Sequence, residues 1–178
     1  MSDIEAERQI RYWLLDMDGV LIHEEDPIPG APEFINRLKE LEIPFLVLTN
    51  SSIYSRRDLS ARLHRSGLEV PEKSIWTSAL ATATFLRDQR PNGSAFVVGE
   101  PGLATAMHEA GYTINESDPD YVVLGETRTY SFERITQAIR LILKGARFIA
   151  TNPDNVGPAP GGVLPATGSG AALISRAT

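Results

Sequence analysis

The stretch that decides the fold is Tyr12-Trp13-Leu14-Leu15-Asp16-Met17-Asp18-Gly19-Val20, in which four apolar residues run directly into a pair of carboxylates. Residues 12–15 are apolar without alternation, which predicts a strand buried on both faces of a parallel sheet. Asp16 and Asp18 are two positions apart on an extended segment, so their side chains project in roughly the same direction. An acid at the end of an apolar run is costly to bury without a cation or hydrogen bonds, but Asp-Gly is also a common turn pair. The residues alone therefore leave a ligand site and a solvated turn open.

A second apolar run ends in small polar side chains. Residues 44–48 predict a strand that leads into Thr49, Asn50 and Ser51. Hydroxyl and amide groups suit a grip on phosphate oxygens, because they donate hydrogen bonds without adding charge. A helix is predicted to start at Pro32 between the two strands, and a right-handed crossover brings both strand ends to one edge of the sheet.

Short apolar runs alternate with helical-period segments along the rest of the chain, which predicts an α/β fold with a mainly parallel sheet. Further strands are predicted at residues 75–77, 95–98, 121–124 and 147–150. Further helices are predicted at residues 55–67, 79–89, 103–110 and 132–144. Ser55 followed by Asp58 is typical of a helix start with a side-chain cap and a first-turn acid.

The last part of the chain is rich in Pro and Gly. Residues 151–170 predict an ordered loop region with one short strand at Val163 and Leu164. Residues 171–178 begin a helical pattern without a stop signal, so we expect a C-terminally truncated chain.

The composition limits the classes of function. The chain has 178 residues, 42% of them hydrophobic, and a formal net charge of −6. An acidic balance argues against a nucleic-acid partner, and no apolar run approaches the ~18 residues that span a membrane. A phosphate ester would need local positive charge from a metal ion, Lys or Arg. The polar N-terminus and the absence of Cys fit a cytoplasmic protein.

Taken together, the motifs of the chain resemble the haloacid-dehalogenase superfamily, and within it the NagD-like phosphatases. The resemblance covers essentially all of the sequence and rests on six segments in order, Asp16-Met17-Asp18-Gly19-Val20-Leu21, Pro29-Gly30-Ala31, Leu48-Thr49-Asn50-Ser51, Trp76-Thr77-Ser78-Ala79, Gly125-Glu126-Thr127-Arg128 and Ala150-Thr151-Asn152-Pro153-Asp154. It implies a Rossmann-like parallel-sheet core, here incomplete, with a large inserted α/β cap.

The resemblance also implies roles for individual residues. Asp16 would be the nucleophile that forms an aspartyl-phosphate, and Asp18 would be the general acid and then the general base. Mg²⁺ would be bound by the Asp16 carboxylate and the Asp18 backbone carbonyl. The substrate would be a small phosphorylated metabolite, either a nucleoside monophosphate or a sugar or polyol phosphate. The phosphate-binding residues so implied are Gly19, Thr49, Asn50 and Ser51.

The same resemblance divides the chain. Residues 1–78 would be the N-terminal part of the catalytic core, residues 79–166 the cap, and residues 167–178 the start of the return segment to the core. Arg128, Asn152 and Asp154 are expected to line the cleft from the cap side. A phosphate-neutralising Lys and later magnesium-binding acids belong to the family pattern but have no counterpart in this sequence. We therefore expect little or no phosphatase activity from the chain alone.

Two alternatives stay open. In a metal-dependent glycosyltransferase, Asp16 and Asp18 would hold Mn²⁺ and a nucleotide diphosphate, but Thr49 and Asn50 would have no role. In a non-catalytic truncated product, an exposed sheet edge would favour self-association, so a homo-oligomer is possible.

Three other signals are discounted. The histidines are dispersed without metal-ligand spacing, so zinc is not expected. The charges from Arg56 to Arg65 are interpreted as a solvated helix face. The segment Gly168-Ser169-Gly170 lacks the third Gly of a dinucleotide-binding motif.

Overall fold

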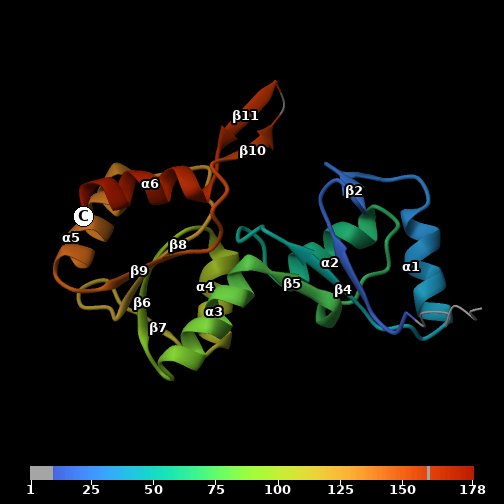
Figure 1. Ribbon diagram of the computed structural model, residues 1–178, viewed down its shortest axis with the longest axis horizontal. Helices are drawn as coiled ribbons and strands as arrows, with labels where there is room; N and C mark the ends of the chain where they lie inside the picture. The colour runs from blue at the N-terminus through green and yellow to red at the C-terminus, as the bar shows by residue number, and fades with distance from the viewer. Residues whose placement is uncertain (1–9, 160) are drawn as a thin grey trace, which may run out of the picture.

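The computed structural model describes residues 10–159 and 161–178, which form two bodies, each built on a parallel sheet of its own (Figure 1). The first sheet has three strands in the order β1-β4-β5, and the second has four in the order β7-β6-β8-β9. Two antiparallel hairpins, β2-β3 and β10-β11, form separate two-stranded sheets. The predicted α/β class with parallel sheets is confirmed.

The first body contains the motif that decides the fold. Its parallel strands are β1 (Trp13–Asp16), β4 (Phe45–Thr49) and β5 (Ile75–Thr77). Its helices are α1 (Ala31–Glu40), α2 (Arg56–Arg65) and the short 3₁₀-helix Glu72–Ser74. The hairpin that follows β1 consists of β2 (Ile22–His23) and β3 (Asp26–Pro27).

The start of α2 follows directly from its sequence. The Ser55 side chain accepts a hydrogen bond from the Asp58 N–H, and the Asp58 carboxylate accepts one from the Ser55 N–H. This reciprocal pair satisfies two backbone donors that a helix start would leave unpaired. The predicted cap at Ser55 is confirmed.

Only one face of the first sheet is covered. Leu15, Val47 and Ile75 form one row across the three strands and are 8%, 0% and 1% exposed, respectively. They pack in one apolar cluster with residues of α1 and α2. Leu14, which points to the opposite face, is 67% exposed. The prediction that this strand is buried on both faces is therefore wrong here, because both helices lie on the same side of the sheet.

The second body has helices on both faces of its sheet. Its strands are β6 (Ser94–Val98), β7 (Thr113–Ile114), β8 (Tyr121–Leu124) and β9 (Arg147–Ala150). Its helices are α3 (Ser78–Gln89), α4 (Pro101–Glu109), α5 (Phe132–Leu143) and α6 (Thr167–Ala177). One apolar cluster joins α3 and α4 to the sheet, and the other joins α5 and α6 to its opposite face. Both central strands are consequently buried.

The segment predicted as a loop is largely ordered into regular elements. β10 (Val156–Ala159) and β11 (Gly162–Pro165) form a hairpin that projects from the second body (Figure 1). The helix α6 begins at Thr167, four residues before the predicted start. Gly168 lies inside this helix. A Cβ at this position would come within 2.3 Å of the Pro153 carbonyl oxygen, so the glycine is needed for close packing and does not indicate a loop. None of the helices in the described part of the chain is long and apolar enough to cross a membrane.

The contacts of α6 show with which of the two bodies residues 167–178 pack. This helix packs against α5, β8 and β9, and its Ile174 is fully buried in the cluster shared with α5. Residues 167–178 thus lie with the four-stranded sheet in this structure. The assignment of functional domains stays a prediction.

Candidate active site

The carboxyl ends of β1 and β4 bring two of the predicted residues together. β1 and β4 are parallel neighbours, with Asp16 in register with Leu48. The Thr49 hydroxyl donates a hydrogen bond to Asp18 Oδ2 at 3.3 Å. The two polar segments that follow these strands therefore meet at one edge of the sheet, as the crossover argument predicts.

The backbone turns sharply after the two acids. Gly19 has a φ of +82°, a conformation that is strained for any residue with a side chain. Its N–H donates to the carbonyl of Ile22 at 2.8 Å, which closes the turn. Asp16, at the end of β1, accepts a hydrogen bond on Oδ1 from the Met17 N–H at 2.9 Å. This bond fixes one carboxylate oxygen of Asp16 and leaves the other without a protein partner among the described residues.

The buried Thr49 connects the two segments. Its oxygen accepts a hydrogen bond from the Ser51 N–H at 3.1 Å, while its hydroxyl donates to Asp18. The side chain is thus held in one orientation, with its proton directed at the acid.

Opposing influences act on the Asp18 carboxyl. Desolvation by the surrounding protein raises its pKa above the ordinary value, and the nearby Asp16 carboxylate raises the pKa further. The Arg62 guanidinium and the hydrogen bond from Thr49 lower it, but the net pKa stays raised. Asp18 therefore keeps a proton to higher pH than an ordinary Asp.

Arg62 was missed by sequence reasoning, which placed it on a solvated helix face. Its side chain is only 20% exposed, and it donates to the backbone carbonyl of Glu24. Leu59 and Leu63 in the same helix are fully buried. The signal was present in the spacing, because a residue three positions after Leu59 lies on the same helix face. For Arg62 the interpretation as a solvated charge is wrong.

Of the cleft residues predicted in the second body, Asn152 and Asp154 contact the end of β4, and Arg128 does not. Asn152 donates from Nδ2 to the backbone carbonyl of Asn50 at 3.0 Å. The Asn50 side chain donates to Asp154 Oδ2 at 2.9 Å. Both residues follow β9, whose carboxyl end therefore adjoins the end of β4. Arg128 is exposed and has no such contact with Asn50 in the described structure.

Glu126 is a second acid on this side. Its N–H donates to the buried Ser52 hydroxyl at 2.7 Å, which ties the end of β8 to the loop after β4. Desolvation raises the pKa of the Glu126 carboxyl, Arg128 lowers it, and Asp18 and Asp154 raise it further. The carboxyls of Asp18 and Asp154 therefore lie close enough to that of Glu126 to influence its protonation.

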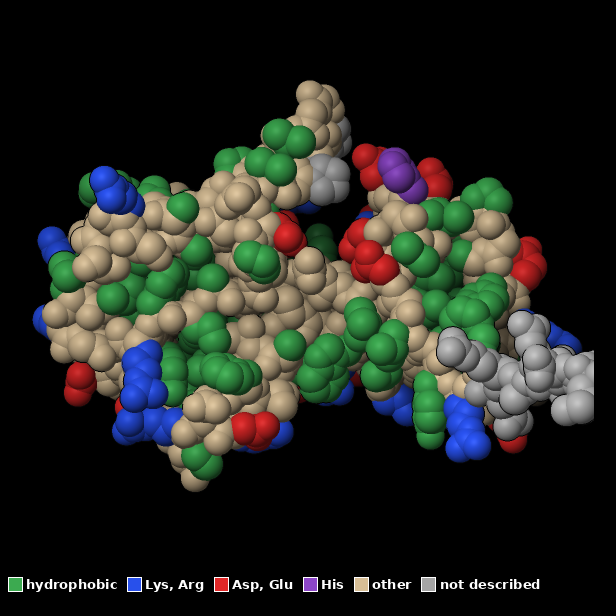
Figure 2. All heavy atoms as spheres, in the orientation of Figure 1, with side chains coloured by type: hydrophobic (Ala, Val, Ile, Leu, Met, Phe, Trp, Pro, Cys, Tyr) green, Lys and Arg blue, Asp and Glu red, His purple; other side chains and the backbone are tan. Residues whose placement is uncertain are grey.

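The surface of the molecule agrees with this arrangement. Figure 2 shows Asp and Glu side chains on both walls of the hollow between the two bodies, with the β10-β11 hairpin above it. Among the described residues, no group of three or more His, Cys, Asp and Glu is placed to hold a metal ion. The predicted binding of a metal ion by Asp16 and Asp18 therefore stays a prediction.

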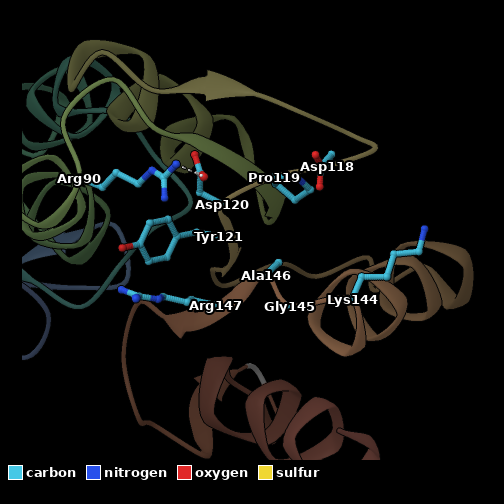
Figure 3. Close-up of a pocket in the computed structure, with 9 residues that line it drawn as sticks. All are labelled: Arg90, Asp118, Pro119, Asp120, Tyr121, Lys144, Gly145, Ala146 and Arg147. Atoms are coloured by element: carbon cyan, nitrogen blue, oxygen red, sulfur yellow. Dashed lines mark ion pairs between the residues drawn. The ribbon is translucent and has the colours of Figure 1, made fainter.

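A cavity of about 240 Å³ lies elsewhere (Figure 3). It is lined by Asp120 and Tyr121 at the start of β8 and by Arg147 at the start of β9. Parallel strands put these starts at the edge opposite the acidic cleft. Arg90 points toward Asp120 across the cavity and pairs with it at 2.8 Å. The cavity is thus separate from the acidic site.

The structure is an α/β fold in which Asp16 ends a parallel strand and Asp18 follows two residues later. Residues 13–113 match the haloacid dehalogenase-like hydrolase family. The chain belongs to this family.

Curated relatives and solved structures extend the match. The chain is 61% identical over 166 residues to the dihydroxyacetone phosphatase of Corynebacterium glutamicum, covering 93% of this chain and 60% of the relative. It is 41% identical to the ribonucleotide monophosphatase NagD of Escherichia coli, covering 94% of this chain and 65% of the relative. A 4-nitrophenylphosphatase from Thermotoga maritima has a similar structure, with a TM-score of 0.89, 35% identity and coverage of 95% and 65%. The chain thus spans less than two thirds of the length of these proteins.

Proposed function

We propose that this chain carries the nucleophile and the general acid of a magnesium-dependent phosphatase that hydrolyses small phosphate monoesters. The observation that carries this proposal is the hydrogen bond from the Thr49 hydroxyl to Asp18, which joins the two strand ends at 3.3 Å. The phosphatase activities named for the relatives support it.

In the proposed reaction, the free carboxylate oxygen of Asp16 attacks phosphorus. A bond forms between that oxygen and phosphorus, and the bond from phosphorus to the leaving alkoxide oxygen breaks. Asp18 gives its proton to the leaving oxygen and later takes one from the water that hydrolyses the aspartyl-phosphate. The raised pKa of Asp18 supports this role, because the acid stays protonated closer to neutral pH.

Magnesium suits the oxygen donors that are present. Asp16 and Asp18 are close enough that the charge of Asp16 raises the pKa of Asp18, and a cation would relieve that repulsion. Mg²⁺ is commonly bound by one or two carboxylates together with water and phosphate oxygens. When bound, it would neutralise charge on the phosphoryl group. The Asn50 backbone, Gly19 and Ser51 would hold that group, and Thr49 would join them by turning its hydroxyl proton from Asp18 to a phosphoryl oxygen.

We propose the class of substrate from the activities named for two relatives. A triose phosphatase at 61% identity favours small sugar or polyol phosphates, and a nucleotidase at 41% identity keeps nucleoside monophosphates as the second class. Residues 79–166 would form the cap that selects among them, with Arg128, Asn152 and Asp154 near the cleft. Rates or affinities for dihydroxyacetone phosphate and a ribonucleoside monophosphate would separate the two classes. We place this activity in the cytoplasm, and neither a nucleic-acid polymer nor a membrane is a proposed partner.

Binding tests the proposed site without requiring turnover. Amide chemical shifts of the chain would be followed during titration with MgCl₂ and then with inorganic phosphate. We expect changes at residues 16–20 and 49–51, and we expect Asp16→Asn to weaken them. Asp88→Asn in α3 is the matched control, with the same charge change outside the cleft. Phosphate-dependent shifts confined to other parts of the chain would contradict the proposal.

Turnover by the chain alone is a separate matter. We propose that it is low, because the described residues contain no group of three or more His, Cys, Asp or Glu side chains that could hold the metal. Hydrolysis of p-nitrophenyl phosphate with Mg²⁺ measures this. Rapid turnover that Asp16→Asn abolishes would overturn the expected inactivity and leave the phosphatase proposal intact.

Self-association is the second candidate behaviour. Tyr12 and Leu14 are 71% and 67% exposed on or beside the edge strand β1. An apolar strand edge can pair with another copy, and Lys at an edge opposes such pairing. Light scattering should therefore show association that increases with concentration and that Leu14→Lys reduces. A monomer at all concentrations would count against a homo-oligomer.

A further inference from the structure

The backbone carbonyl of Asn50 accepts two side-chain hydrogen bonds. Ser78, the first residue of α3, donates from Oγ at 2.7 Å, and Asn152 donates from Nδ2 at 3.0 Å. Both donors are buried, each 9% exposed. A buried donor that loses its partner is costly, so these two bonds fix the carbonyl firmly.

The same peptide unit is also held at its other end. The N–H of Ser51 belongs to the peptide that begins with the Asn50 carbonyl, and it donates to Thr49 Oγ1 at 3.1 Å. Because this N–H occupies the Thr49 oxygen as an acceptor, the Thr49 proton is directed away from it and toward Asp18. The chain of bonds runs from the second body to the acid on the first.

The two polar atoms of Asn152 have separate tasks. Nδ2 donates to the Asn50 carbonyl, and Oδ1 accepts from the Asp154 N–H at 3.0 Å. Both atoms are therefore engaged inside the protein. This favours an indirect role for Asn152 over direct contact with a substrate.

We propose that Asn152 and Ser78 are positioning residues, which hold the Asn50–Ser51 peptide and thereby set the direction in which the Thr49 hydroxyl donates. Through this peptide, the second body sets the geometry of the phosphate-gripping turn. The catalytic meaning of this role rests on the proposed phosphatase function. The hydrogen bonds from which the positioning is inferred do not depend on that function.

Asn152→Asp separates the two tasks. The new side chain has the same shape and can still accept from the Asp154 N–H, but its carboxylate cannot donate to the Asn50 carbonyl. Asn155→Asp is the matched control, with the same change of charge three residues further on at an exposed position whose side chain has no hydrogen bond among the described residues. Ser78→Ala removes the other donor.

Amide hydrogen exchange measured by NMR on the whole chain reports the outcome. We expect the Ser51 amide to exchange about fivefold to tenfold faster in Asn152→Asp, the effect of losing one hydrogen bond. The Asp154 amide should keep its protection, and Asn155→Asp should leave Ser51 unchanged. Ser78→Ala should also accelerate Ser51, and the two changes together should be non-additive because they share one acceptor.

The exchange rates of two amides, Ser51 and Asp154, test the positioning role of Asn152 and Ser78. Unchanged Ser51 exchange in both Asn152→Asp and Ser78→Ala would overturn the proposal. Equal acceleration of the Ser51 and Asp154 amides in Asn152→Asp would show general loosening and would also overturn it. If Asn152→Asp does not fold, Ser78→Ala alone decides by the same amide. Failure of phosphate binding would sink the phosphatase proposal without changing these exchange rates.

Discussion

The two sheets of this protein are built from similar apolar strands but are covered differently. In the four-stranded sheet, Val122 and Val123 on β8 are both fully buried, because helices cover both faces. In the three-stranded sheet, the adjacent Leu14 and Leu15 on β1 are 67% and 8% exposed, respectively. An apolar run therefore reports that a strand is suited to burial, while the helices around it decide how many of its faces are buried.

The largest effect is expected in the doubly covered sheet. Phe96 on β6 is fully buried, and the Arg134 guanidinium lies 4.1 Å from the centre of its ring. Phe96→Ala should lower the free energy of unfolding by about 3–5 kcal/mol, because it leaves a cavity. Phe132→Ala is the control, since Phe132 is 82% exposed and should cost less than about 0.5 kcal/mol. Urea unfolding compares the two, and equal losses would contradict the packing described.

The next effect separates the two faces of β1. Leu15→Ala should cost about 2–5 kcal/mol, whereas Leu14→Ala should change the free energy of unfolding by less than about 0.5 kcal/mol. The substitutions are chemically identical and adjacent, so burial alone distinguishes them. Urea unfolding again measures the difference. A large loss from Leu14→Ala would mean that the open face is covered in solution, for example by a second copy of the chain.

A smaller effect is expected where the two bodies touch. Gly102 donates from its N–H to the Ile53 carbonyl, and a Cβ there would lie 2.5 Å from the Tyr54 carbonyl carbon. Gly102→Ala should gain about 1 kcal/mol of helix propensity but lose about 1–3 kcal/mol to the clash, for a net destabilisation. Gly170→Ala in α6 meets only movable side-chain atoms, at 3.3 Å, and should be tolerated. Thermal unfolding of both variants tests the contact, and stabilisation by Gly102→Ala would refute it.

The smallest effect concerns charge at the open site. The pKa of Asp18 is raised in the folded chain, so the wild type loses stability as pH rises through that folded-state pKa. In chelator-containing buffer, Asp18→Asn should therefore be more stable than the wild type at neutral pH, by less than about 1 kcal/mol because water still screens the carboxyl. The advantage should vanish below the ordinary pKa of Asp. Melting temperature against pH measures this, and an Asp18→Asn variant no more stable than the wild type at neutral pH would contradict the prediction.

Much of the fold could be read from local patterns. The strands at residues 75–77, 121–124 and 147–150 were predicted with their observed bounds, and Ser55 with Asp58 predicted the start of α2. These features depend on a few neighbouring residues. The hairpin β10-β11 was only partly predicted, and the start of α6 was missed. Glycines in that segment serve a tight turn and a close helix contact, which a local reading cannot tell from a loop.

Some residues of the candidate site could likewise be predicted from local patterns, and others could not. Asp16, Asp18 and Thr49 could be singled out because each follows a predicted strand, and parallel strands bring their ends to one edge. Ser52 could not be singled out, because its role depends on the Glu126 N–H from a distant part of the chain. The spacing from Leu59 indicates the helix face of Arg62 but not its contact with the Glu24 carbonyl.

The sequence by itself determined the alternation of strands and helices, the capped start of α2 and the pair of acids at the first strand end. Only the tertiary structure decided that β1 is open on one face, that Arg62 donates to the Glu24 carbonyl, and that Asn152 reaches the Asn50 carbonyl across 102 positions of the chain. The physical reason is the range of the interactions. Backbone conformation and capping are set by near neighbours, whereas burial, desolvation and hydrogen bonds between the two bodies exist only after the chain has folded.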